Sequence, residues 1–151
     1  MLWQTLSFAE LSTAQLYELL QLRVDVFVVE QHCAYPELDG KDCLAHTRHL
    51  LGTDSQGKLQ AYARLLAPGV SYAEPSIGRV VVNAAVRGQG IAQQLMQQAI
   101  AQCEQLWPQQ AITIGAQQYL MAFYQSLDFI CVSAGYLEDG IPHIDMRRTG
   151  R

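Results

Sequence analysis

The sequence is poor in charged residues and has no long hydrophobic run. Only 16% of its 151 residues are charged, against about 25% in an average globular protein. The net charge is −4, whereas affinity for nucleic acid comes mainly from lysine and arginine neutralising phosphates. No stretch approaches the ~20 apolar residues that span a bilayer, and no basic segment precedes an apolar one at the N-terminus. We therefore expect a cytoplasmic protein with neither a nucleic-acid partner nor a membrane partner.

Cysteine is also scarce, and its spacing does not fit a metal site. Four cysteines are too few for a disulfide scaffold in a chain of this length. Cys103 and Cys131 lie in apolar segments, where we expect them to be small core residues. Cys33 and Cys43 have histidines nearby, but nine residues separate them, whereas paired zinc ligands are usually two to four residues apart. The sequence predicts no bound metal.

Alternating helix and strand patterns fill the rest of the chain. Half of the residues are hydrophobic, enough for one domain over residues 1–151 with a core of its own. The order of the elements predicts an α/β layer sandwich in which one helix joins a parallel pair of strands. We expect helices at 13–28, 88–107 and 118–126, and strands at 49–53, 59–65, 76–83, 111–115, 129–137 and 141–146, with hairpin turns at 54–57 and 138–140.

Two irregular segments are candidates for binding. Residues 32–43 carry Pro36, Gly40 and three acids, which fits either a solvated connection or a loop that faces a substrate. Gly88 and Gly90 lie between a valine-rich strand and an amphipathic helix whose first turn has no acid. A helix start has unpaired N–H groups and a partial positive charge, and glycine lets a ligand approach them. This turn is therefore predicted to bind phosphate.

The motifs around this turn resemble the GNAT superfamily of acyl-CoA-dependent N-acetyltransferases. The resemblance rests on Val80–Val82, Arg87–Ala92, Gln117 and Phe123–Phe129, and it covers nearly the whole chain. Residues 22–31, 37–42 and 138–143 further resemble the ElaA-like branch. The resemblance implies a three-layer sandwich, a mixed central sheet with flanking helices. It also implies acetyl-CoA as co-substrate and the primary amine of a small molecule or peptide as acceptor.

The resemblance also assigns roles to particular residues. Tyr124 would give a proton to the departing CoA thiolate, although the residue pattern alone fits a core aromatic equally well. Two positions depart from the family pattern. Gln117 replaces the usual asparagine, and Asp128 replaces a glycine, which raises the question of strain at positive φ. The cofactor would contact Val80, Val81, Val82, Arg87, Gly88, Gln89, Gly90, Ile91, Ala92, Gln117 and Phe123.

The general base is left open by the sequence. Many relatives carry a glutamate on the strand where Arg79 and Val81 stand here. Glu30, His49 and His143 are the substitutes, directly or through water, although each also fits a purely structural role. Arg79 would pair with the acidic loop or line the acceptor pocket. The substrate pocket predicted in this way consists of Phe27, Glu30, His49, Arg79 and His143.

Two other functions remain open at this point. One is an acyl-homoserine-lactone synthase, whose N-terminal half has a similar pattern of arginine, Val-Phe and an acidic loop. This chain lacks that family's extra length. The other is a non-catalytic acyl-CoA sensor or a toxin-neutralising partner. The sequence leaves open whether the protein is a monomer or a homodimer.

Overall fold

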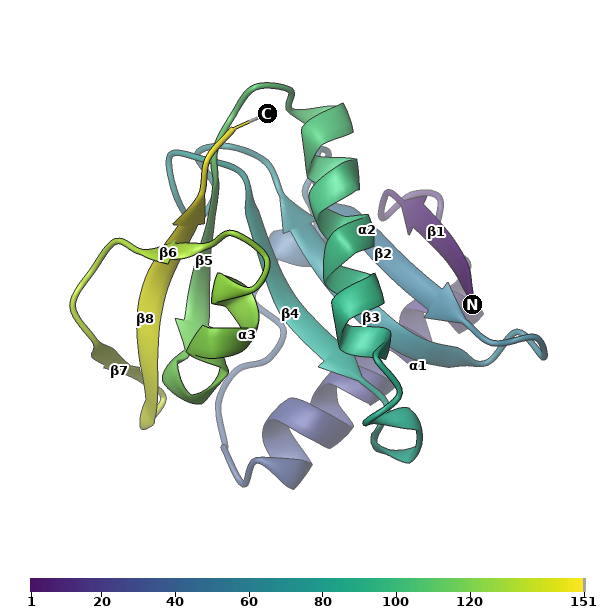
Figure 1. Ribbon diagram of the computed structural model, residues 1–151. Coiled ribbons are helices and arrows are strands. Elements are labelled where there is room, and N and C mark those ends of the chain that lie inside the picture. The colour runs from purple at the N-terminus through teal and green to yellow at the C-terminus, as the bar shows by residue number, and fades with distance from the viewer. Residues whose placement is uncertain (151) are drawn as a thin grey trace.

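The computed structural model describes residues 1–150, which form two sheets and three main helices (Figure 1). The first sheet has the order β1 (Leu2–Leu6), β2 (Arg48–Thr53), β3 (Leu59–Leu66) and β4 (Ser76–Val82). The second has the order β5 (Ile112–Gln117), β8 (Ile141–Arg148) and β6 (Ile130–Cys131), and β7 (Tyr136–Glu138) also pairs with β8. The helices are α1 (Thr13–Val24), α2 (Ile91–Leu106) and α3 (Met121–Gln125).

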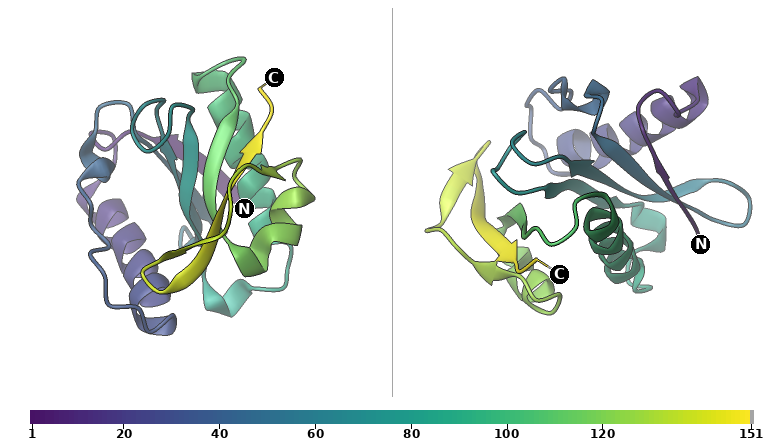
Figure 2. Two further views of the ribbon diagram at one scale, coloured as in Figure 1. Left: turned by 90° about the vertical axis from the view of Figure 1, so that its left-hand side faces the viewer. Right: turned by 90° about the horizontal axis from the view of Figure 1, so that it is seen from above.

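The helices cover the sheets from both sides, as the three-layer prediction requires. Helices α2 and α3 lie on one face and α1 lies on the other (Figures 1 and 2). Helix α2 turns Leu95, Met96 and Ala99, all fully buried, toward the larger core cluster. The exposed glutamines of α2 occupy its opposite side, as its amphipathic pattern predicts. The mixed α/β class is confirmed.

Strands β4 and β5 do not form the parallel pair that the sequence predicts. They run in the same direction, start close together and then diverge (Figure 1). A hydrogen bond from the Thr113 N–H to the Pro75 carbonyl, 3.0 Å long, joins their beginnings. Every strand ladder within residues 1–150 is antiparallel. The α2 crossover therefore links two sheets that open away from each other.

The expected elements differ from the structure in a few places. The helix expected to reach residue 28 changes after Val24 into a π-helix, Asp25–Glu30, where β-branched residues crowd an α-helix. Strand 129–137 is interrupted, since only β6 and β7 are extended. Cys131 is exposed on the edge strand β6, so its core assignment is wrong, whereas Cys103 is buried as expected.

Both predicted hairpins are confirmed. Strands β2 and β3 pair antiparallel around a turn in which Gly57 has φ 79°. Strands β7 and β8 pair around Asp139 and Gly140, with φ of 50° and 78°. Two consecutive positive φ values are the geometry that a tight hairpin with right-handed strand twist requires.

Candidate active site

A cleft of about 1240 Å³ occupies the opening between the two sheets. The ends of β4 and β5, the start of α2, the π-helix, the loop 31–41 and the β7–β8 hairpin all contribute to its lining. The cleft exists because β4 and β5 diverge. Where they separate, neither strand has a neighbouring strand on its facing edge. The cleft is the expected binding site at the carboxyl ends of the strands.

The glycine turn at the start of α2 leaves its backbone donors accessible. Gly88 and Gly90 have φ of 81° and 76°, and an added Cβ on either would meet no atom within 4 Å. Gly90 is the N-cap of α2, no side chain caps this end, and its first turn contains no acid. The first N–H groups of a helix have no partner inside the helix. The turn therefore provides an open, partly positive cradle that fits an anion such as a pyrophosphate.

The valine segment of β4 faces this cleft on one side. The sequence predicts a strand buried on both faces, but Val80 and Val82 are only half-buried and Val81 alone is buried. A bulge precedes them, because the pairing with β3 shifts between Tyr62 and Arg64 and Arg79 has φ 49°. The half-burial of Val80 and Val82 is a consequence of the open cleft, and an extended ligand could lie along this edge.

Tyr124 is buried in the core and also lines the cleft. It is 7% exposed, packs edge-on against Phe123 and Phe129, and lines the cleft. Burial raises the pKa of Tyr124 to about 12, so its hydroxyl stays protonated at neutral pH. That hydroxyl makes no hydrogen bond within residues 1–150, which leaves it able to donate to a ligand.

Several predicted site residues form ion pairs or hydrogen bonds around the cleft. Arg87 Nη1 lies 2.8 Å from Glu30 Oε2, and Arg87 Nε donates to the Val82 carbonyl. Gln117 Nε2 lies 3.5 Å from Gln31 Oε1 at the mouth of the cleft. The carboxylate of Glu30 is thus already paired with a guanidinium. Glu30 and Arg87 connect the π-helix to the glycine turn at the start of α2.

The two candidate histidines have different surroundings. His49 is fully buried, and its ring nitrogens lie 2.6 Å from the Tyr62 hydroxyl and 3.0 Å from the Asp42 carbonyl. Burial lowers the pKa of His49. His49 does not line the cleft, so its placement in the substrate pocket is wrong. His143 does line it, with Nδ1 2.7 Å from the Ile141 carbonyl and Nε2 3.4 Å from Glu138.

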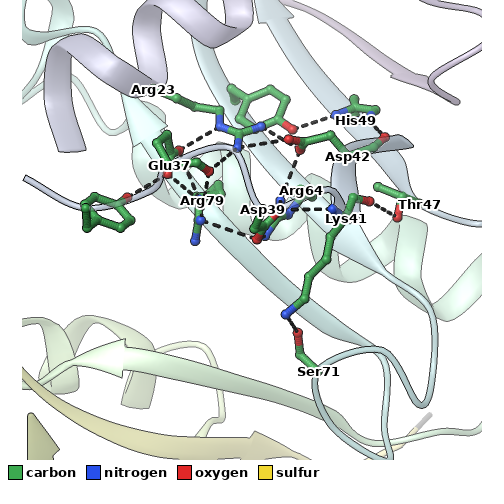
Figure 3. Close-up of polar contacts among 12 residues, drawn as sticks. Arg23, Glu37, Asp39, Lys41, Asp42, Thr47, His49, Arg64, Ser71 and Arg79 are labelled. Carbon is green, nitrogen blue, oxygen red and sulfur yellow. Dashed lines mark hydrogen bonds and ion pairs between the residues drawn. The ribbon is translucent and has the colours of Figure 1, made fainter. Parts of the chain in front are cut away.

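The acidic loop ends in a buried ion network that sequence reasoning missed (Figure 3). Arg23, fully buried on α1, lies 2.9 Å from Glu37 and 2.7 Å from Asp42. Two more arginines join this network. Arg64 pairs with Asp39 and Asp42, and Arg79 pairs with Glu37 and Asp39. The one available signal was an arginine at an apolar-stripe position of α1.

The acidic loop contacts both this network and the cleft, and so does Arg79. The loop buries Glu37 and Asp42 and also turns Cys33, Tyr35 and Asp39 toward the cleft. Arg79 pairs with the acidic loop, which is one of the two expectations for it, and it also lines the cleft. A second missed group consists of Tyr72, Tyr136 and Asp145, which meet over Gly115 at the cleft wall.

Among residues 1–150, no group of three or more metal-ligating side chains is arranged to hold a metal ion, and no helix is long and apolar enough to cross a membrane.

The cleft brings together most of the residues that the sequence selects. Gln89 and His49 alone among the selected residues do not line the cleft. Those that do are Phe27, Glu30, Arg79, Val80, Val81, Val82, Arg87, Gly88, Gly90, Ile91, Ala92, Gln117, Phe123, Tyr124 and His143.

Asp128, which stands where the family pattern has glycine, adopts a positive φ. Its φ is 69°, in the left-handed region that glycine adopts without strain. The residue follows α3 directly, where a helix commonly ends in this conformation. The question of strain raised by the sequence therefore applies, because Asp128 has a positive φ.

Comparisons with known proteins give consistent results. Residues 18–149 match the model of the acetyltransferase (GNAT) domain. The chain is 49% identical to protein ElaA of Escherichia coli over 146 residues, which cover 97% of this chain and 95% of the relative. The crystal structure of an acyl-CoA N-acyltransferase from Pseudomonas aeruginosa has a TM-score of 0.92 at 46% identity, covering 97% of this chain and 98% of that one.

A CoA-dependent acyl-homoserine lactone synthase is also similar in structure. Its TM-score is 0.79, covering 97% of this chain and 82% of that one, but the identity is 16%. At that level of identity the likeness concerns the fold alone.

Proposed function

The chain belongs to the GNAT acetyltransferase family, and on that premise we propose that it transfers an acetyl group from acetyl-CoA to a primary amine by direct attack. The observation that carries this proposal is the uncapped, glycine-bounded start of α2 in a cleft that also contains the protonated Tyr124. The cytoplasmic location and the choice between monomer and homodimer stay predictions from the sequence.

The proposed cofactor contacts follow from this geometry. The N–H groups at 88–92 bind the pyrophosphate, because they are donors at the positive end of α2. The edge of β4 at Val80–Val82, where Val80 and Val82 are half-buried, receives the extended arm of the cofactor. Arg87 would keep its contact with Glu30 or exchange it for a phosphate, since its side chain is partly exposed.

Two proton transfers complete the proposed reaction. The amine nitrogen attacks the thioester carbonyl, a C–N bond forms, and the C–S bond breaks. Tyr124 donates its proton to the departing sulfur and regains a proton from solvent. The proton lost by the amine passes to His143, directly or through water.

His143 is the proposed base because its surroundings differ from those of the alternatives. Its Nδ1 lies 2.7 Å from the Ile141 carbonyl, so the ring proton sits on Nδ1 and Nε2 can accept another. Glu138, 3.4 Å from Nε2, would stabilise the resulting imidazolium. His49 has both nitrogens engaged away from the cleft, and Glu30 is paired with Arg87.

Ligand-dependent melting and thiol release test the proposal together. We expect acetyl-CoA to raise the melting temperature, with a gain of about 2.7 kcal/mol at a concentration near 100 times Kd. NAD and ATP at equal concentration should have no such effect. Release of free thiol with a broad panel of amines would indicate an enzyme. Binding of acetyl-CoA without thiol release would instead favour the acyl-CoA sensor.

Tyr124→Phe tests the proposed acid. Losing the hydroxyl should lower kcat by about 10²–10⁴-fold and leave acetyl-CoA affinity nearly unchanged. Tyr17→Phe is the matched control, because Tyr17 is 74% exposed on α1 and outside the cleft. Steady-state kinetics and melting curves decide the matter, and an unchanged kcat for Tyr124→Phe would remove this residue from the mechanism.

A further inference from the structure

A carboxylate without a cationic partner lies in the wall of the cleft. Asp145 Oδ1 accepts hydrogen bonds from the hydroxyls of Tyr72, 2.8 Å away, and Tyr136, 2.7 Å away. Its other oxygen, Oδ2, accepts no hydrogen bond from residues 1–150, and Asp145 forms no ion pair with any of them. Asp145, both tyrosines and Gly115 line the cleft. We call these four residues the Asp145 group.

Gly115 makes room for this arrangement. Gly115 is paired with Asp145 across the β5–β8 ladder, so both face the same side of the sheet. A Cβ at position 115 would lie 3.0 Å from the Tyr72 hydroxyl and 3.1 Å from the Tyr136 hydroxyl. The two hydroxyls thus converge over the bare backbone from separate segments, the β3–β4 loop and β7.

The two tyrosines donate to Asp145 as neutral hydroxyls. Burial, followed by the hydrogen bond to Asp145, raises the pKa of Tyr72 to about 12 and also raises that of Tyr136. Both tyrosines therefore remain protonated donors at neutral pH, and neither adds a charge beside Asp145.

The charged groups elsewhere in the cleft do not neutralise Asp145. Arg64 and Arg79 are paired with carboxylates of the acidic loop, and the Lys41 ammonium donates to Ser71. Four more carboxylates, those of Glu30, Asp39, Glu138 and Asp139, also line the cleft, and Arg87, the remaining arginine there, is paired with Glu30. A half-buried anion in a cleft is stabilised by a cation, and the described chain supplies none at Asp145.

We propose that the Asp145 group binds a second, non-reacting ammonium group of the acceptor, which makes the acceptor a diamine or a similar dication. The inference rests on the proposed amine acetylation. A carboxylate favours the charged form of an amine and so raises its pKa, whereas the attacking amine must be neutral. The group held by Asp145 is therefore not the nucleophile, and a different amine of the same molecule reaches the thioester.

Direct binding of matched amines tests this proposal without requiring turnover. The probes are diaminobutane, diaminopentane and diaminohexane, each compared with the monoamine of the same chain length by calorimetry. We expect the native protein to bind the best diamine about 10–100-fold more tightly than its monoamine, the range of a hydrogen bond to a charged group. Equal affinities for the diamines and monoamines would overturn the proposal.

Asp145→Asn is the decisive variant, because it keeps the shape and the Oδ1 acceptor and removes only the charge. We expect it to abolish the diamine preference, whereas Glu74→Gln should keep it. Glu74 lies on the Tyr72 loop outside the cleft, so that variant is the matched charge control. If Asp145→Asn melts early, Gly115→Ala replaces it, since its methyl group displaces the two hydroxyls. A diamine preference that survives in the folded variant overturns the proposal.

Kinetics separate this proposal from the proposed function. If the chain acetylates amines, Asp145→Asn should lower kcat/KM for the diamine by a much larger factor than kcat/KM for the monoamine, whereas Glu74→Gln should leave the ratio of the two unchanged. If acetyl-CoA releases no thiol with any amine, the acetyltransferase proposal fails, yet the calorimetric preference and its loss still decide the role of Asp145. Thiol release without a diamine preference would contradict the Asp145 proposal alone.

Discussion

The two long helices begin in opposite ways. Helix α1 is closed by a complete capping box, in which the Ser12 hydroxyl accepts from the Gln15 N–H and the Gln15 side chain accepts from the Ser12 N–H. Helix α2 begins at Gly90 with no side-chain cap and no acid. Two N–H groups at the start of α1 are thus bound by side chains of its own sequence, whereas no side chain binds those at the start of α2.

The same contrast continues beyond the helix starts. Arg23 in the last turn of α1 enters a buried network of three guanidiniums and three carboxylates, whose charges balance. The first turn of α2 faces the cleft and has no ion pair other than that of the neighbouring Arg87 with Glu30 within residues 1–150. We infer that substitutions around α1 change stability, whereas substitutions at the start of α2 change ligand binding.

The largest expected effect is that of Gly90→Val on acetyl-CoA binding. A β-branched side chain at φ 76° is strained and would occupy the open space in front of the N–H groups. We expect affinity to fall more than about 10⁴-fold, about 5.5 kcal/mol, so that calorimetry detects no binding to a folded protein.

Gly57→Val separates the strain from the blocked approach. Gly57 has φ 79° and equally open surroundings, but it lies in the β2–β3 turn, away from the cleft. It should lose similar stability and bind acetyl-CoA normally. Normal affinity in Gly90→Val would mean that this turn is only a connection.

Arg23→Ala should have the next largest effect, this time on stability. Removing one partner of a buried ion pair leaves uncompensated charge and typically costs about 3–5 kcal/mol. Arg147→Ala is the control, because its ion pair with Glu74 is much more exposed than that of Arg23 and pairs at the surface contribute about 0–1 kcal/mol. Urea unfolding curves measure both. A cost for Arg23→Ala as small as that of the control would contradict a stabilising network.

Lowering the pH should reduce the difference in the free energy of unfolding between the native protein and Arg23→Ala. Burial would raise the pKa of Asp42, but hydrogen bonds and charges from Arg23 and Arg64 lower it overall. Because the folded pKa lies below the unfolded value near 3.9, the stabilisation is complete above that pH and is lost as pH falls through the folded pKa. Unfolding curves below about pH 4 should therefore show a smaller cost of Arg23→Ala than curves at pH 7.

Much of this contrast could be predicted from the sequence, because it depends on local patterns. The Ser12–Gln15 box, the helical stripe of α2 and the paired glycines at 88 and 90 are each encoded within a few residues. The pairing of Arg23 with Glu37 and Asp42 is not, because those residues are 14 and 19 positions apart along the chain. Nothing local shows which acid an arginine will meet.

The surroundings of His49 and Asp145 also depend on contacts between residues far apart in the sequence. His49 resembles any strand histidine in sequence, and only the packing of β2 on β3 brings it to the Tyr62 hydroxyl. Asp145 and Tyr72 are 73 residues apart and meet because β5 and β8 pair beside the β3–β4 loop. The glycine turn at the start of α2 is a local motif, whereas the cleft wall around Asp145 is assembled from distant segments, so a sequence pattern predicts the first more fully than the second.

Ser12→Ala should have a moderate effect on stability and none on binding. The loss of an N-cap hydroxyl costs about 0.5–2 kcal/mol, and Ser12 lies outside the cleft. Melting curves should show the loss, and acetyl-CoA affinity should not change. A parallel fall in affinity would indicate that α1 positions the cleft after all.

The smallest expected effect comes from giving α2 the acid that it lacks. Gln93 is the third residue of α2 and lines the cleft, so Gln93→Glu places a carboxylate where it can satisfy the free N–H groups and the helix dipole. We expect the ligand-free protein to gain about 0.3–1 kcal/mol in stability. The same charge should repel the pyrophosphate and weaken acetyl-CoA binding by a few-fold. Gln97→Glu, one turn further on and outside the cleft, should do neither, because the dipole effect is confined to the first turn. Opposite signs for stability and affinity at position 93, measured by melting and calorimetry, would show that the uncapped helix start exchanges stability for ligand binding. A gain in both would contradict that exchange.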